Sequence, residues 1–298
     1  WKGRFAECRG GEIVPEDPDK RHYVGFPAMN GICAHLLEHD NIDVVLRTRA
    51  CARYEPSESG RPWALTAHGD GRYLGEFDWL ISGDRLSGTN NRADLRDANL
   101  LDFKAKVEPI ASVPILVLMV AFEKPIKGLP YDGVKFDEKD GEFGALGWIA
   151  RDTSKPGRNR DDGKECWVIQ SGAKAAHDVI ASIEEEDFET RRELVREKAK
   201  ELLMNDFLSA IRKLANDDEA ESTPQILSAV GHRWSAAFPL VSPSGDTYSN
   251  QGKDCLVDRD KNFVACGDYL GKLTGRIEGA YLSGRAAASV IINAIRNQ

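Results

Sequence analysis

Residues 263–298 read FVACGDYLGKLTGRIEGAYLSGRAAASVIINAIRNQ, and this stretch indicates the fold class more clearly than any other part of the chain. Its first four residues form a short apolar run that stops at Gly267-Asp268, which is typical of a buried strand ending on a turn. A loop with two glycines follows, and from about Ile277 onward the residues suit one long helix. A strand, a glycine loop and a helix in this order predict an α/β fold.

The beginning of the predicted helix has unusually small side chains, at Gly279, Ala280, Ser283 and Gly284. Glycine destabilises a helix by ~1 kcal/mol relative to alanine, so two glycines here indicate that another backbone or a flat ligand approaches closely. The free N–H groups of a first helical turn also attract electron-rich oxygens. We therefore expect a nucleotide cofactor at the edge of a sheet. The alternative is a core strand and helix of an α/β domain that holds no ligand.

These residues resemble the C-terminal flavin-binding motif of the FAD-dependent amine oxidase superfamily. Within it, the resemblance is to the renalase-like oxidoreductases, which include plant and algal plastid members. The resemblance implies that Asp268, after Gly267, hydrogen-bonds the ribityl or pyrophosphate part of FAD. It also implies that the start of the helix faces the isoalloxazine ring and stabilises negative charge on it, through the backbone of Ile277, Glu278, Gly279 and Ala280.

Two further positions enter through the same resemblance. Residues 41–54 alternate in a way that predicts a strand, and the family uses the end of this strand to contact adenine through a valine backbone, where this chain has Ala50. Residues 77–83 predict a buried strand ending at Gly83, which the resemblance places near the pyrophosphate of FAD. Asp84 departs from the family pattern, which has a proline or an apolar residue there. Ordinary sheet strands are the alternative interpretation of both segments.

The fold that the resemblance implies is α/β with two intertwined domains: a flavin-binding, Rossmann-like domain and an antiparallel-sheet substrate or cap domain. Residues 113–122, 143–150 and 166–171 predict strands of the cap domain, and residues 184–215 predict a long amphipathic helix. We expect the cap domain at 1–25 and 104–222, and the flavin-binding domain at 26–103 and 223–298. Three polar stretches are expected to be a mobile loop at 151–164, an acidic linker at 216–223 and a second loop at 242–251.

Composition excludes several classes of protein. The chain has 298 residues, is 41% hydrophobic and 30% charged, and carries a formal net charge of −8, which disfavours a nucleic-acid partner. No apolar run approaches the roughly 20 residues that span a bilayer, so we expect no transmembrane segment. The six cysteines show neither close pairing nor zinc spacing and predict free thiols in a reducing intracellular compartment. The resemblance implies a plastid, and the cytoplasm is the alternative location.

No metal site is expected, although His35 and His39 lie one helical turn apart. No catalytic triad or carboxylate pair stands out either. A flavin carries the redox chemistry itself, so the protein positions the substrate and excludes water. The aromatic candidates for contact with a small-molecule substrate are Trp234, Trp148 and Trp167; for each, a place in the core is the bland alternative.

One motif is missing: the chain contains no GxGxxG, which a dinucleotide-binding protein places near its beginning. Either this unit precedes Trp1 in a longer protein, or the lineage has lost it. The first explanation predicts an FAD-dependent oxidoreductase that oxidises a small molecule by hydride transfer to flavin. The second predicts a flavin-less relative that acts as a structural or assembly subunit of a larger complex, for example in a plastid.

Overall fold

The structure is a computed structural model that describes residues 1–55, 58–88, 94–95, 98–137, 143–215, 223–239 and 254–297. The expected loop at 242–251 and the expected linker at 216–222 lie outside the described residues. The chain divides into two compact units: unit 1 is Trp1–Asp43 with Pro114–Ala237, and unit 2 is Val44–Val113 with Phe238–Gln298. The chain therefore crosses between the units three times, and each unit is built from two separate stretches of sequence.

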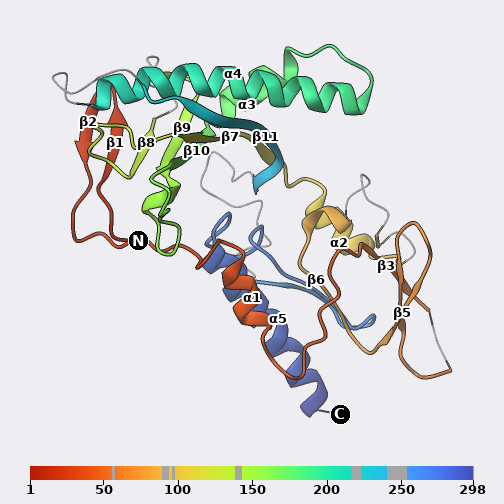
Figure 1. Ribbon diagram of the computed structural model, residues 1–298. Coiled ribbons are helices and arrows are strands. Elements are labelled where there is room, and N and C mark those ends of the chain that lie inside the picture. Colours follow the sequence, from red (N-terminus) through yellow and green to blue (C-terminus); the bar gives the residue numbers. More distant parts are fainter. Residues whose placement is uncertain are drawn as a thin grey trace. The chain divides into compact units, whose positions relative to one another are not determined.

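Unit 1 contains a seven-stranded sheet (Figure 1). Its strands, in spatial order, are β11 (Ile226–Pro239), β7 (Ser112–Phe122), β10 (Glu165–Ser171), β9 (Leu146–Arg151), β8 (Gly133–Phe136), β1 (Phe5–Arg9) and β2 (Glu12–Pro15). β7, β10, β9 and β8 pair antiparallel in that order, and so do β1 and β2, whereas β1 and β8 are parallel. The expected antiparallel sheet is confirmed.

Helices α3 (Ala173–Ala181) and α4 (Phe188–Leu214) pack on this sheet (Figure 1). The apolar stripe of α4 is buried, from Val195 to Leu214, in a core shared with β7, β9 and β10. The helix begins after Asp187, whose side chain accepts a hydrogen bond of 2.8 Å from the backbone N–H of Thr190. This cap explains why α4 starts later than residue 184, where the helix was expected.

Unit 2 contains two three-stranded sheets. One has the order β12 (Leu256–Asp258), β13 (Phe263–Ala265), β6 (Leu80–Ser82), and the other has the order β3 (Ala50–Tyr54), β4 (Trp63–Ala67), β5 (Tyr73–Phe77). Between them lies a core around Trp63, Phe103 and Phe263. Trp63 donates its indole N–H to the carbonyl of Lys261 at 2.7 Å, which ties the second sheet to the turn before β13.

Helix α5 (Ile277–Arg296) covers the first sheet of unit 2, and Ala287 is buried against Val264 and Cys266. The other helices are α1 (Gly31–Leu37) in unit 1 and α2 (Leu101–Val107) in unit 2, with one-turn 3-10 helices at Arg85–Gly88 and Asp152–Ser154. The α/β class with two intertwined units is confirmed. None of the helices within the described residues is long and apolar enough to cross a membrane.

Several expectations need correction. The strand expected over residues 41–54 is confined to Ala50–Tyr54. Leu46 is 76% exposed, and Arg47 adopts a positive φ of 54°, which interrupts an extended strand before it reaches a partner. The strand expected over residues 77–83 is only Leu80–Ser82, because Phe77 belongs to β5 in the other sheet.

The loop expected to be mobile, residues 151–164, is held by several contacts. Arg151 is the last residue of β9 and forms an ion pair of 3.2 Å with Asp132. Arg158 donates to the carbonyl of Pro27 at 3.0 Å and pairs with Asp152 at 2.6 Å. The unit boundaries also lie later than the expected domain boundaries, at 43/44, 113/114 and 237/238. The last of them lies near the end of β11, a long strand whose hydrogen bonds keep most of its residues in unit 1.

Candidate functional site

Two sequence-predicted site residues, Gly83 and Gly267, meet at one edge of the first sheet of unit 2. β6 and β13 are parallel, with Ala265 opposite Ser82, so both strands end at the same edge. The backbone N–H of Cys266 donates to the carbonyl of Ser82 at 2.9 Å. A Cβ built on Gly267, whose φ is 144°, would lie 3.2 Å from the carbonyl oxygen of Gly83. The sheet edge thus presents two glycines side by side, and Gly83 has open space where a side chain would project.

Asp268 and the start of α5 are held beside these glycines by a closed loop. The backbone N–H of Gly275 donates to the carbonyl of Asp268 at 2.7 Å, so the chain turns back just before α5 begins at Ile277. The buried hydroxyl of Ser283 accepts a hydrogen bond of 2.9 Å from the N–H of Gly267 and donates to the carbonyl of Asp254. One serine on α5 therefore fixes the end of β13 against the helix.

The first turn of α5 has free N–H groups. Arg276 precedes the helix and makes no side-chain cap, and Ile277 is 58% exposed. Such a turn can donate hydrogen bonds to an oxygen-rich ligand. Glu278 is exposed in the same turn; its carboxylate stabilises the helix but repels an anion, so any ligand contact at this position must use the backbone.

Gly279 and Ala280 behave differently from the rest of this turn. A Cβ on Gly279 would lie 2.0 Å from the carbonyl oxygen of Leu273, so the close approach expected at this glycine is made by the loop of the same chain. Ala280 donates its N–H to Arg276 and is already part of the helical hydrogen-bond ladder. The free donors of α5 are therefore the N–H groups of Ile277, Glu278 and Gly279.

Three polar side chains define the electrostatics of this sheet edge: Asp268, Arg85 and Tyr269. Burial raises the pKa of the Asp268 carboxyl, and the nearby Arg85 guanidinium partly opposes that rise. Within the described part of the chain, the hydrogen bond to this carboxylate comes from its own backbone N–H. The buried hydroxyl of Tyr269 has no hydrogen-bond partner, and burial raises its pKa far above the ordinary value. A half-buried carboxylate and an unpartnered hydroxyl are groups that a polar ligand would satisfy.

Sequence reasoning missed Arg85 and Tyr269 and treated Ser283 only as a small residue. Tyr269 directly follows Gly267-Asp268, and Arg85 follows Gly83 by two positions, so nearness to the predicted strand ends was the available signal. No sequence pattern shows which buried hydroxyl lacks a partner, because that depends on packing.

The remaining predicted site residues are not brought to this edge by any recorded contact. Ala50 is exposed at the start of β3, in the other sheet of unit 2. The three tryptophans belong to unit 1. Trp234 is 57% exposed on β11, whereas Trp167 is 1% exposed and donates its indole N–H to Glu165 at 2.7 Å. Trp148 stacks on Phe5, with ring centroids 6.4 Å apart.

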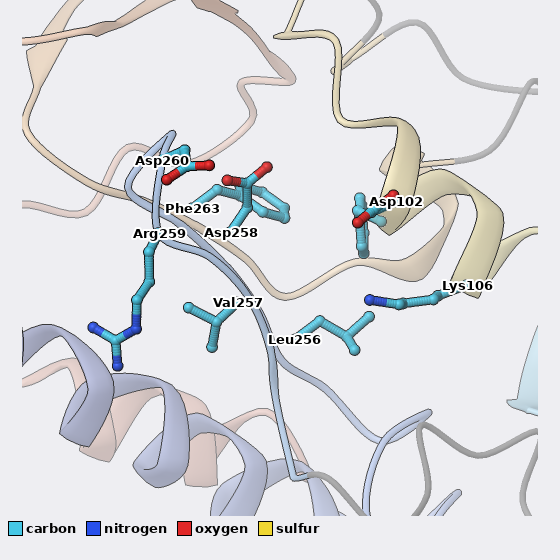
Figure 2. A pocket seen from close by; sticks show the side chains of 9 residues that line it. Asp102, Lys106, Leu256, Val257, Asp258, Arg259, Asp260 and Phe263 are labelled. Atoms are coloured by element: carbon cyan, nitrogen blue, oxygen red, sulfur yellow. The ribbon is translucent and has the colours of Figure 1, made fainter.

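A cavity of about 430 Å³ lies at the opposite end of β13, between α2 and the turn after β12. Figure 2 shows Lys106 extending from α2 toward Leu256, with Asp258 and Asp260 on the turn. Since Phe263 begins β13 and Gly267 follows its end, this cavity lies away from the glycines. Ligands of α/β sheets bind outside the carboxyl ends of the strands, which favours the Gly83–Gly267 edge as the functional site.

Metal and disulfide chemistry are not apparent in this structure. All six cysteines are free. Within the residues that the structure describes, no group of three or more His, Cys, Asp or Glu side chains could hold a metal ion. The His35 ring lies 3.5 Å from Glu38, and His39 accepts a hydrogen bond from the backbone of Asn41.

Comparison with known proteins points to flavoenzymes. Residues 186–292 match the family model described as flavin containing amine oxidoreductase, a stretch that includes α4, β11 to β13 and most of α5. The fold is similar to a crystal structure described as a "putative protoporphyrinogen oxidase" from Exiguobacterium sp. 255-15, with a TM-score of 0.55 and 11% sequence identity. That match covers 91% of this chain and 51% of the other, so the chain spans about half the length of the protein it resembles.

Proposed function

We propose that the Gly83–Gly267 edge of unit 2 forms part of a flavin site, and that the protein is an FAD-dependent oxidoreductase acting on a small molecule. The observation that carries this proposal is the meeting of two glycine-terminated parallel strands with Asp268 and an uncapped helix start. The match of residues 186–292 to flavin containing amine oxidoreductases supports it, because that stretch contains Gly267, Asp268 and the first turns of α5.

Each residue of this edge has a stated duty in the proposal. The carboxylate of Asp268 accepts a hydrogen bond from a hydroxyl of the cofactor. The absence of side chains at Gly83 and Gly267 lets the backbone come close to the cofactor's pyrophosphate. The N–H groups of Ile277 and Glu278, and with them that of Gly279, stabilise negative charge on the cofactor ring.

A bound flavin supplies the redox chemistry by accepting a hydride from the substrate. The chain's own part is to bind the cofactor, orient it and exclude water from it. The backbone at Ala50 is proposed to contact adenine, and Trp234, the most exposed of the three candidate tryptophans, is proposed to contact the substrate. Trp148 and Trp167 are less accessible for that role.

Two finer proposals rest on the sequence resemblance alone. We propose that the protein is renalase-like among flavoenzymes, and that it acts in a plastid. A fluorescent fusion of the complete gene product, expressed in plant cells, tests the location: exclusion of the fusion from plastids would contradict it.

Replacing Asp268 tests the cofactor site. In protein expressed from the complete gene, Asp268→Ala leaves a cofactor hydroxyl unpaired, which costs ~1–3 kcal/mol, or about a ten- to hundredfold loss of FAD affinity. Fluorescence titration with FAD measures the affinity. Asp70→Ala, at an exposed turn of the same unit, is the matched control and should bind FAD as the parent does.

Thermal unfolding with and without FAD separates a ligand contact from a structural cap. We expect Asp268→Ala to melt below the parent only when FAD is present. An equal deficit in both conditions would assign Asp268 a purely structural duty. A parent protein that is colourless and does not bind FAD would instead support the flavin-less subunit.

A further inference from the structure

A second cavity, of about 400 Å³, lies in unit 1 where α4 meets the edge strand β11. Figure 1 shows α4 running along the sheet, with α3 beside it. The polar side chains that line the cavity are basic or neutral: Arg191, Arg192 and Arg196 from α4, and His232, Arg233 and Ser235 from β11. Four arginines in one cavity are unexpected in a chain with a formal net charge of −8.

A backbone contact holds the two sets of arginines together. A Cβ built on Gly231 would lie 2.0 Å from the carbonyl oxygen of Arg196, so β11 touches α4 at a point where no side chain has room. His232 and Arg233 follow this contact directly and are thereby fixed beside the arginines of α4. The cavity is a built part of unit 1.

Two of the four arginines have carboxylate partners. Arg192 pairs with Glu189 at 2.8 Å, and Arg196 pairs with Glu193 at 3.3 Å. These pairs lie along the exposed side of α4, so they are screened by water and leave both guanidinium groups able to share a second anion.

The other two arginines, Arg191 and Arg233, have no carboxylate partner among the described residues. Arg191 donates only to the carbonyl of Ile180, at 3.3 Å, and the Nε atoms of both arginines are buried without a hydrogen-bond partner. Burial, and then the charge of Arg191, lower the pKa of Arg233. Since a guanidinium remains protonated at neutral pH, two like charges are held close together with unsatisfied donors.

We propose that this cavity binds a phosphoryl group, held between the guanidinium groups of Arg191 and Arg233. A tetrahedral oxyanion accepts several N–H donors at once and cancels the repulsion between the two arginines. Arg192, Arg196 and the Ser235 hydroxyl supply further donors. Phe188 lies at the cavity and is 73% exposed, so a phosphate monoester with a flat or apolar body would also gain a ring contact. This proposal does not depend on the flavin site, whose residues all belong to unit 2.

Calorimetric titration of the complete protein with inorganic phosphate and with adenosine monophosphate tests the proposal, using chloride at equal ionic strength as the reference. We expect both phosphoryl compounds to bind. Arg233→Gln and Arg191→Gln should each weaken binding by about ten- to a hundredfold, the effect of losing charged hydrogen bonds. Arg212→Gln, an exposed arginine in the last turn of the same helix, should bind like the parent.

Two further measurements guard against a trivial result. Arg233→Lys keeps the charge but loses the Nε–H donor and should bind more weakly than the parent. Without phosphate, Arg233→Gln should melt at or above the parent temperature, because a repulsion has been removed. Vesicles containing phosphatidic acid show whether a lipid headgroup can supply the same group. Unchanged phosphate affinity in both glutamine variants, or equal stabilisation of the parent by phosphate and chloride, would overturn the proposal.

Discussion

Asp268 is a carboxylic acid in a place that disfavours its charge. Burial raises its pKa above the ordinary value of 3.8, so in the flavin-free fold the ionised form is held at a cost. Well below pH 3.8 the carboxyl is protonated in both the folded and the unfolded chain, and there is no penalty. As the pH rises through the raised pKa of the folded state, the penalty develops fully.

Asp268→Asn should remove this penalty. In flavin-free protein, the difference in Tm between Asp268→Asn and the parent should be near zero at acidic pH and should grow in favour of the variant toward pH 7. A series of thermal melts at different pH values measures it, with Asp70→Asn as the exposed control. A variant that loses stability relative to the parent as the pH rises would show that the charged carboxylate has a partner in the fold.

Tyr269 has a buried hydroxyl without a hydrogen-bond partner, while its ring packs in the core with Phe263 and Leu270. Tyr269→Phe keeps the ring and removes the unsatisfied group, so flavin-free protein should be more stable by up to ~1–3 kcal/mol. Urea denaturation measures the change. A loss of more than about 1 kcal/mol would reveal a partner for the hydroxyl.

At the level of single elements, α5 contains a pair of glycines in contrasting surroundings. A Cβ on Gly279 would collide with the carbonyl of Leu273, whereas a Cβ on Gly284 would meet nothing within 4 Å. Gly279→Ala should therefore destabilise the protein, because the loop must move away from the helix. Gly284→Ala should stabilise it by up to ~1 kcal/mol through helix propensity. Urea denaturation of the two variants compares them directly, and similar effects of both would contradict the packing described here.

The sequence predicted those elements whose signals are local. Helix α5 begins at Ile277 and β5 spans Tyr73–Phe77, as expected, because small residues, glycines and apolar runs mark them. The alternation over residues 41–49 was misleading: a period of two indicates a strand only where a partner strand is present, and here the side chains are exposed. Gly279 was correctly assigned a close approach, but the sequence could not show that Leu273 makes it.

The pairing of β6 with β13 could not be predicted either, because its partners lie far apart in the sequence. Two expected site residues, Gly83 and Gly267, came together only through that pairing. The arginine cavity of unit 1 was likewise unpredicted. The charges of α4 were interpreted as a solvated face, and only the contact at Gly231 brings Arg233 beside them.

For the molecule as a whole, the division into units predicts where a cofactor is felt. On addition of FAD, hydrogen–deuterium exchange should slow around Gly83, Gly267 and the first turn of α5, all in unit 2. The central strands β9 and β10 of unit 1 should exchange at unchanged rates. Asp268→Ala at the same FAD concentration should show weaker protection. Protection confined to unit 1 would place the cofactor elsewhere.

The triple crossing also sets an order on synthesis. A chain made from its N-terminus has completed both stretches of unit 1 once Ala237 is added, but unit 2 still lacks Phe238–Gln298. Until Ala265 has been made, β6 has no parallel partner, and its edge is open to pairing with other chains. Contacts over such a separation form slowly. The sheet edge that carries Gly83 is therefore assembled last on the ribosome, and a nascent chain arrested before that point has unit 1 complete but no such edge.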